Sequence, residues 1–237
     1  PSLREFDRLL KVTEGRILYV TLAPEVPGAN PFIRGCIKRG VKVSLGHHNA
    51  TPDQIHRAAD AGATLCTHRG NGLASTIHRH NNPLWPQLAE DRLTASLIAD
   101  GHHLPPDILR TIVRAKGPSR VILTSDATHL AGLNPGRYDL AGIPVQLKRN
   151  QKICLTGTDL LAGSANMLLQ GVHNAIRHTD LSPEQAYAAA STSPAKALNI
   201  RYTPYTASAG KSATFILAEP GQAPIATYIQ GRAFTLS

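Results

Sequence analysis

Ionisable side chains follow five successive stretches of this chain that have the pattern of β-strands. In parallel α/β proteins the carboxyl ends of the strands carry the chemistry, so side chains placed there face a common site. Neutral imidazoles bind divalent metals, and a carboxylate can accept or deliver a proton. One such group alone is commonly a cap or a satisfied polar side chain, but five in a row predict a site. The strands and the groups that follow them are Ile17–Leu22 with Glu25, Val41–Ser44 with His47, Ala63–Thr67 with His68, Leu93–Ala99 with Asp100 to His103, and Val121–Thr124 with Asp126.

The clearest unit of strand, turn and helix surrounds His47, the first candidate metal ligand. Val41–Ser44 is apolar and β-branched, and the turn after it leads to Thr51, a helix N-cap, with Pro52 at the first helical position. Strands and helices alternate in this way through the first half of the chain, which predicts a parallel sheet covered by helices and hence the α/β class. The expected helices are Ser2–Glu14, Pro31–Arg39, Pro52–Ala61 and Pro105–Ala115.

The second half departs from this alternation. Gly136–Leu155 is expected to form an inserted β-hairpin, and Leu161 to Ser164 is expected to lead into a helix that ends near Arg177. A further helix is expected over 182–190, a turn over 194–198, and two strands over 213–217 and 225–229. The segment 69–86, rich in Gly, Asn, His and Pro, is expected to be a long irregular loop, and such loops in compact domains are usually functional.

Composition narrows the possible partners. No apolar run approaches the roughly 18 residues of a membrane span and no signal pattern starts the sequence, so we expect a cytosolic protein with no membrane partner. Cys36, Cys66 and Cys154 form no CxxC pair and are expected to be buried or free thiols. The formal charge of +9 is dispersed, with only four Phe and one Trp for base stacking, which favours a phosphorylated small molecule over nucleic acid.

The number of strands is low for a closed barrel. A barrel of eight parallel strands takes about 250 residues, whereas only five strands of that character precede the expected hairpin, and the sequence starts at Pro1. Either the sheet is open, or the sequence is the latter part of a longer protein.

Six ordered motifs resemble one family. TLAPE at 21–25, GHHNAT at 46–51, TH and NG within 67–72, IADGHH at 98–103, SDA at 125–127 and LAGS at 161–164 are similar to those of the N-acetylglucosamine-6-phosphate deacetylases, a branch of the amidohydrolase superfamily. The resemblance implies a metal-dependent (β/α)8 TIM-type barrel with a small β-sandwich. Residues 1–200 then correspond to barrel strands 4–8, with the hairpin near 136–155 as an insertion, and 201–237 to the C-terminal strands of the sandwich.

The resemblance also implies roles for particular residues. Hydrolysis of the acetamide of N-acetylglucosamine 6-phosphate is the implied activity, with zinc as the first choice of divalent metal and iron, manganese or cobalt as others. A homodimer is implied, in which one residue reaches the site of the neighbouring subunit. The implied roles are metal ligation by His47 and His68, proton transfer by Asp126, carbonyl orientation by His103, phosphate contact by Asn71 and Gly72, reach into the neighbouring site by Arg79, and substrate lining by the loop of Leu161, Ala162 and Gly163.

The sequence also departs from the family pattern. The HxH motif and the metal-binding glutamate of the family's N-terminal half have no counterpart, and Glu25 matches a different family position. Arg69, Gly70 and Gly72 replace two bulky residues and an alanine, which leaves the exact sugar open. The alternatives are a deacetylase for a related N-acetylated sugar, and a non-catalytic fragment that binds sugar phosphate or acts as a scaffold. The chain alone is expected to hold metal weakly and to pack loosely.

Overall fold

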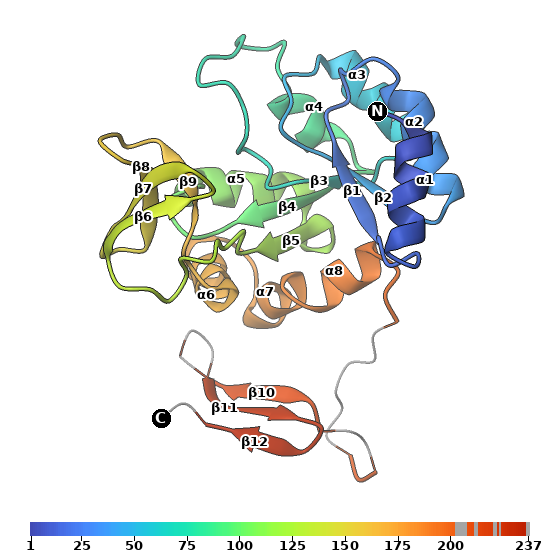
Figure 1. The fold of residues 1–237 in the computed structure, drawn as a ribbon. Coiled ribbons are helices and arrows are strands. Elements are labelled where there is room, and N and C mark those ends of the chain that lie inside the picture. The colour runs from blue at the N-terminus through green and yellow to red at the C-terminus, as the bar shows by residue number, and fades with distance from the viewer. Residues whose placement is uncertain (202–207, 211–212, 220–221, 223, 236–237) are drawn as a thin grey trace.

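The main sheet consists of five parallel strands in sequential order, β1-β2-β3-β4-β5. The computed structural model describes residues 1–201, 208–210, 213–219, 222 and 224–235 (Figure 1). Sequential order places every crossover in the same direction, which is how strands follow one another around a barrel rather than in a doubly wound sheet. The strands are β1 (Tyr19–Leu22), β2 (Lys42–Leu45), β3 (Leu65–Cys66), β4 (Thr94–Ile98) and β5 (Val121–Thr124).

Helices connect these strands and pack against one another along the outside of the sheet. The series begins with α1 (Leu3–Val12), whose N-cap Ser2 accepts a hydrogen bond from the backbone N–H of Glu5. The connecting helices are α2 (Ala29–Lys38), α3 (Pro52–Asp60), α4 (Leu84–Ala89) and α5 (Pro106–Lys116). Further along the chain, α6 (Leu168–His178), α7 (Pro183–Ala189) and α8 (Thr192–Ala197) cover the region next to β5.

The start of α3 confirms the predicted turn and cap. The side chain of Thr51 accepts a hydrogen bond from the backbone N–H of Gln54, and the side-chain oxygen of Gln54 accepts one from the backbone N–H of Thr51. This reciprocal capping box satisfies two N–H groups that have no partner within the helix. The loop that carries His47 is thereby fixed at both ends, by strand β2 and by a capped helix.

Two apolar clusters fill the space between the sheet and the helices. The first joins α2 and α3 to β2 through residues such as Ile33, Leu45 and Ile55, which are fully buried. The second joins α5 and α6 to β4 and β5 through residues such as Leu97 and Val121. Burial of each large aliphatic side chain contributes about 1.5–3 kcal/mol, so the carboxyl ends of the strands are mounted on rigid elements.

The expected hairpin over 136–155 is part of a larger structure. Residues 136–155 contain three strands instead of the two of a hairpin. Together with a fourth strand, from the segment expected to lead into a helix, they form an antiparallel sheet of order β6-β7-β8-β9. Its small core contains Val145, Leu147 and Ile153. Leu161, Ala162 and Gly163 are therefore strand residues and not a loop, which corrects that expectation. The strands are β6 (Gly136–Leu140), β7 (Ile143–Leu147), β8 (Lys152–Leu155) and β9 (Leu161–Ser164).

Other expected bounds also change. Strand β3 is only two residues long, and α4 begins inside the segment expected to be an irregular loop. At the C-terminal end, the two expected strands are joined by a third in an antiparallel sheet of β10 (Phe215–Ala218), β11 (Pro224–Ile229) and β12 (Arg232–Phe234). The division into 1–200 and 201–237 stays a prediction, since residues 202–207 lie outside the described residues.

Candidate active site

His47 and His68 meet at the carboxyl ends of β2 and β3. Their Nε2 atoms are 2.8 Å apart, and the two rings stand nearly perpendicular, at 84°. His68 is only 7% exposed, and its Nδ1 atom is buried without a hydrogen-bond partner. Burial lowers the pKa of the His68 imidazole, and the adjacent His47 acts in the same direction. His68 therefore stays neutral near pH 7, which is the form that binds a metal.

Three of the candidate residues have left-handed backbone conformations. The φ angles of His47, His68 and Asp126 are 51°, 27° and 49°. Such conformations cost about 1–3 kcal/mol each for residues other than glycine and concentrate at functional sites. Each of the three residues lies two positions beyond the end of its strand, so all three lie at the carboxyl edge of the sheet.

A chain of hydroxyl groups joins the strand ends beneath the two histidines. The Oγ1 of Thr67 lies 2.8 Å from the Oγ1 of Thr21 and 2.6 Å from the Oγ of Ser44. Gly46 allows these side chains to approach, because a Cβ atom there would lie 2.8 Å from the Cβ of Thr67 and 2.9 Å from the Cγ2 of Thr21. These contacts fix the spacing of β1, β2 and β3 at the level of His47.

Asp100 and His103 form a second pair after β4. Nδ1 of His103 donates to a carboxylate oxygen of Asp100 at 2.8 Å, and the other oxygen accepts the backbone N–H groups of His102 and His103, each at 2.8 Å. Burial alone would raise the pKa of Asp100, but these hydrogen bonds outweigh it and the pKa lies below its ordinary value. The Asp100 carboxylate thus fixes the orientation of the His103 ring through Nδ1, and Nε2 is left to contact a substrate.

Asp126 lies at the end of β5, on the same cavity as His68. The cavity has a volume of about 230 Å³, and the hydroxyls of Ser44, Thr67 and Thr124 come from residues that line it. The backbone beyond Asp126 is held by β9, because Ala127 forms a parallel bridge with Ser164 and Thr128 donates to the Ser164 carbonyl at 2.8 Å. Asp126 itself is exposed.

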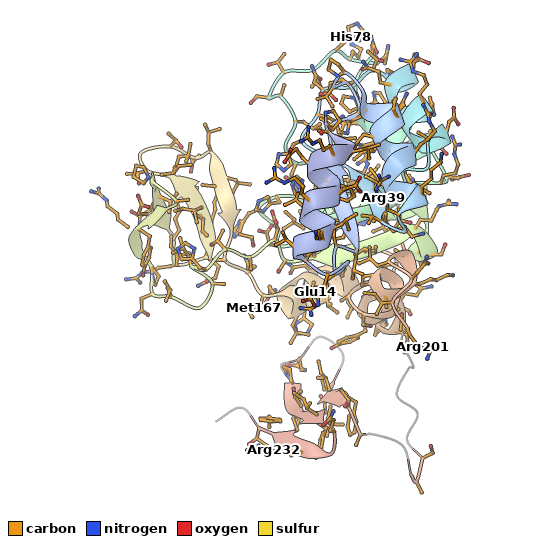
Figure 2. All side chains as sticks on the ribbon, turned by 45° about the vertical axis from the view of Figure 1, so that its right-hand side comes forward. Glu14, Arg39, His78, Met167, Arg201 and Arg232 are labelled. Carbon is orange, nitrogen blue, oxygen red and sulfur yellow. The ribbon has the colours of Figure 1, made fainter. Side chains whose placement is uncertain are left out.

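The loop after β3 places the predicted phosphate residues beside His47. Both the backbone and the side-chain amide of Asn71 donate to the carbonyl of His68, at 3.0 and 3.3 Å. Gly72 has a φ of +68°, and a Cβ atom there would lie 2.9 Å from Nδ1 of His47. Arg79 is exposed. Its neighbour in the sequence, His78, lies at the upper edge of the molecule (Figure 2).

Strand β9 reaches the site through its backbone and through Ser164. Gly163 has a φ of +98°, and a Cβ atom there would lie 2.6 Å from Cγ2 of Thr128. The Ser164 hydroxyl is 3.4 Å from a carboxylate oxygen of Asp100. The structure therefore brings the predicted 161–163 segment to the loops after β4 and β5, where Asp100 and Asp126 lie.

The histidines beside the candidate ligands have other partners. His48 is 4% exposed, and its Nε2 lies 2.6 Å from the side-chain amide of Gln87. His102 is 2.9 Å from the Asn150 carbonyl in the turn between β7 and β8. Glu25 accepts the backbone N–H of Asn49 at 2.8 Å, so it positions the loop after β2. The sequence did not identify these partners, nor the role of Asp100, although Asp100 lies only two positions beyond the end of β4.

The two converging imidazoles fit a divalent metal, because both present Nε2 to one point and His68 is held neutral. They are an incomplete set, however, since the part of the chain that the structure describes contains no group of three or more metal-competent side chains. A catalytic zinc site ordinarily has three protein ligands. His47 and His68 therefore account for two of the ligands that such a metal site needs.

A sequential parallel arc with imidazoles and a carboxylate at its carboxyl edge defines the class of (β/α)-barrel proteins with a metal-dependent site. A sequence model of the amidohydrolase family matches residues 2–234, and the chain belongs to this family. Family members use a divalent metal ion. The expected barrel fold is thereby confirmed.

The chain is similar to curated and solved proteins along nearly all of its length. It is 32% identical over 231 residues to the N-acetylglucosamine-6-phosphate deacetylase of Vibrio furnissii, covering 98% of this chain and 57% of that protein. It is 33% identical over 231 residues to the N-acetylgalactosamine-6-phosphate deacetylase of Escherichia coli O157:H7, covering 98% and 60%.

Among solved structures, it matches a mutant of the N-acetyl-D-glucosamine-6-phosphate deacetylase from Mycobacterium smegmatis in complex with N-acetyl-D-glucosamine-6-phosphate. The TM-score is 0.87 at 31% identity, with 98% of this chain and 61% of that one covered. The chain thus spans about three fifths of the length of the proteins that it matches. Across the described residues, no helix is both long and apolar enough to cross a membrane.

Proposed function

We propose that this chain carries the hydrolytic part of an N-acetylglucosamine-6-phosphate deacetylase, which releases acetate and glucosamine 6-phosphate. The observation that carries the proposal is the convergence of His47 and His68 at 2.8 Å beside Asp126 at the carboxyl edge of the sheet. The relatives named for this reaction support it.

An amide resists hydrolysis because its carbonyl is a poor electrophile and its amine is a poor leaving group. A bound divalent metal would make water more acidic and would polarise the carbonyl. We assign zinc first, with iron, manganese or cobalt as alternatives, to His47 and His68. Asp126 accepts the proton of the attacking water and later delivers it to the departing amine.

His103 binds the carbonyl oxygen as negative charge develops on it. When Nδ1 donates to Asp100, Nε2 can donate to that oxygen only from the doubly protonated ring. The hydrogen bond to Asp100 orients the ring before the substrate arrives, which is the condition for effective stabilisation of an oxyanion.

The phosphate is contacted by the loop after β3. Asn71 and Gly72 lie near its start, and we infer that Arg79 completes the phosphate site of a neighbouring subunit in a homodimer. Arg79 suits this role because it is exposed, and none of the ion pairs found among the described residues includes it. A guanidinium grips phosphate with two parallel hydrogen bonds. A phosphorylated substrate also supports a cytosolic location.

A second sugar is favoured by one observation. The N-acetylgalactosamine-6-phosphate deacetylase is as similar to this chain as the glucosamine enzymes are. Gly72, which lies against His47, changes the shape of the substrate-facing loop. The galactosamine substrate therefore stands as the alternative within the same reaction.

The test is the release of acetate from the two sugar phosphates, with added zinc, by the chain supplied with the missing third metal ligand on a further segment, in cis or as a separate polypeptide. The chain without that segment is expected to show no turnover. We expect turnover of N-acetylglucosamine 6-phosphate that Asp126→Asn abolishes and Asp53→Asn, an exposed carboxylate on α3, leaves intact. Faster turnover of the galactosamine compound would favour the alternative. Saturable binding of the sugar phosphate without turnover in the zinc-loaded protein would instead identify a non-catalytic binding module.

A further inference from the structure

Arg69, directly after His68, is a buried cation. The residue is 3% exposed, and none of the ion pairs between described residues involves it. Burial lowers the pKa of its guanidinium to about 10, which still leaves the group protonated at neutral pH. An unpaired buried charge is strongly unfavourable. An anion bound next to the Arg69 guanidinium would therefore stabilise the protein.

The hydrogen bonds of Arg69 leave most of its donors unused. One terminal nitrogen donates to the carbonyl of Leu84 at 2.6 Å, and Nε is buried with no partner. A guanidinium carries five N–H donors in a planar fork. The nearby buried Lys116 cannot serve as a partner, because it is itself a cation and donates to the carbonyls of Gln87 and Glu90.

Arg69 lines a cavity between α4 and α5. The volume is about 340 Å³, within the range of small-molecule sites. Its walls are mainly apolar, and His103 is one of the residues that line it. Asp107 at the rim does not neutralise Arg69, because its side chain is 96% exposed and faces Arg110. The principal lining residues are Arg69, Trp85, Leu88, His103, Ile108 and Ile112.

We propose that this cavity binds a small carboxylate with an apolar body, whose carboxylate pairs with the Arg69 guanidinium while its chain lies between α4 and α5. Charge selects the headgroup, since one cation balances one negative charge, whereas a phosphate dianion would leave a charge uncompensated beside Asp107. The planar fork matches a carboxylate with two parallel hydrogen bonds. This site is separate from the proposed phosphate contacts at Asn71 and Gly72.

The single tryptophan provides the test. Trp85 is the only tryptophan of the chain and lines the cavity, so its fluorescence reports occupancy. Hexanoate, hexan-1-ol and inorganic phosphate are titrated into the full chain. We expect a saturable change with hexanoate at a concentration at least roughly tenfold lower than with the alcohol, and none with phosphate.

Variants identify the group responsible. Arg69→Met should remove the preference for hexanoate, Arg69→Lys should retain part of it, and Arg57→Met, an exposed arginine of α3, should change nothing. Ile108→Glu gives an independent check at a half-exposed position, where the added negative charge should weaken hexanoate binding. Equal affinities for acid and alcohol, an unchanged preference in folded Arg69→Met, or a signal that depends on protein concentration alone, as expected for docking of a second copy, would overturn the proposal.

Discussion

Nδ1 of His103 lies 2.8 Å from a carboxylate oxygen of Asp100, and both side chains are almost completely buried, at 7% and 4% exposure. The same carboxylate holds the turn between them through two backbone N–H groups. A buried hydrogen-bonded pair of this kind fixes the orientation of the ring. The proposed carbonyl contact of His103 therefore depends on a residue that does not touch the substrate.

Asp100→Asn tests this dependence. The amide oxygen can keep the turn, but the amide N–H would face Nδ1 and favour the neutral ring with its proton on Nε2. We expect kcat to fall between roughly tenfold and a hundredfold, because a neutral donor stabilises an oxyanion less than a charged one. Asp53→Asn is the matched control, and an unchanged kcat in Asp100→Asn would contradict the assignment.

His47→Ala and His68→Ala should each remove the bound divalent metal and abolish turnover. A catalytic site has few protein ligands, so the loss of one imidazole is not compensated. Elemental analysis of the purified variants measures the metal directly. His102→Asn, which changes a histidine bonded to Asn150 instead, should keep wild-type metal content. Full metal occupancy in both alanine variants would show that these residues are not ligands.

Gly72→Ala isolates the contact between the loop and His47. A Cβ atom at Gly72 would lie 2.9 Å from Nδ1 of His47. A Cβ atom at Gly132, which is also at positive φ, would have no atom within 4 Å. Both substitutions strain the backbone, but only the first displaces the ring. We expect metal affinity to fall of the order of tenfold in Gly72→Ala and to stay unchanged in Gly132→Ala, as measured by competition with a chelator. Equal effects would mean that the ring has room to move.

Local signals in the sequence predicted the elements that local chemistry determines. Thr51 and Pro52 begin α3 as expected, because an N-cap and a proline at the first helical position act within one turn. The alternation of strands and helices also gave the parallel sheet. In contrast, α4 was not predicted, because Pro83 and Pro86 within and before it are typical of a loop.

Hydrogen-bond partners that are far apart in the sequence could not be predicted from it. The hydrogen bond between His48 and Gln87 spans 39 positions, and the contact from Ser164 to Asp100 spans 64. Strand β9 was assigned to a loop for the same reason, since only its pairing with β8 makes it a strand. The candidate ligands could be identified because each follows its own strand, whereas the residues that hold them come from other elements.

Arg79 and Asp126 allow a complementation test of the proposed homodimer. A subunit with Arg79→Ala keeps its own Asp126. A subunit with Asp126→Asn keeps Arg79, which extends into the site of the other subunit. Their heterodimer should therefore contain one intact composite site, which restores roughly a quarter of wild-type activity after random exchange. Activity is measured before and after mixing, with exchange verified by native mass spectrometry. No recovery after complete exchange would mean that Arg79 serves its own subunit.

Glu90 joins α3 to the turn before β4 and should make the fold sensitive to acid. Its carboxylate accepts hydrogen bonds from Arg92 at 2.8 Å and lies 3.1 Å from Nδ1 of His56, while Arg92 also bonds Asp60. The hydrogen bonds from Arg92, only partly opposed by burial and assisted by His56, lower the pKa of Glu90 from 4.5 to about 2.

The direction of the pH effect follows from this shift. Between pH 4.5 and about 2 the unfolded chain binds a proton at Glu90 that the folded chain does not, so the free energy of unfolding rises with pH across that window. Glu90→Gln should therefore lower stability at pH 7 by about 1 kcal/mol, a value discounted because Arg92 is half exposed. The difference from wild type should shrink as pH falls toward 2. Urea unfolding at pH 7, 4 and 3 measures it, and a difference that stays constant over these pH values would show that Glu90 contributes through packing rather than through its charge.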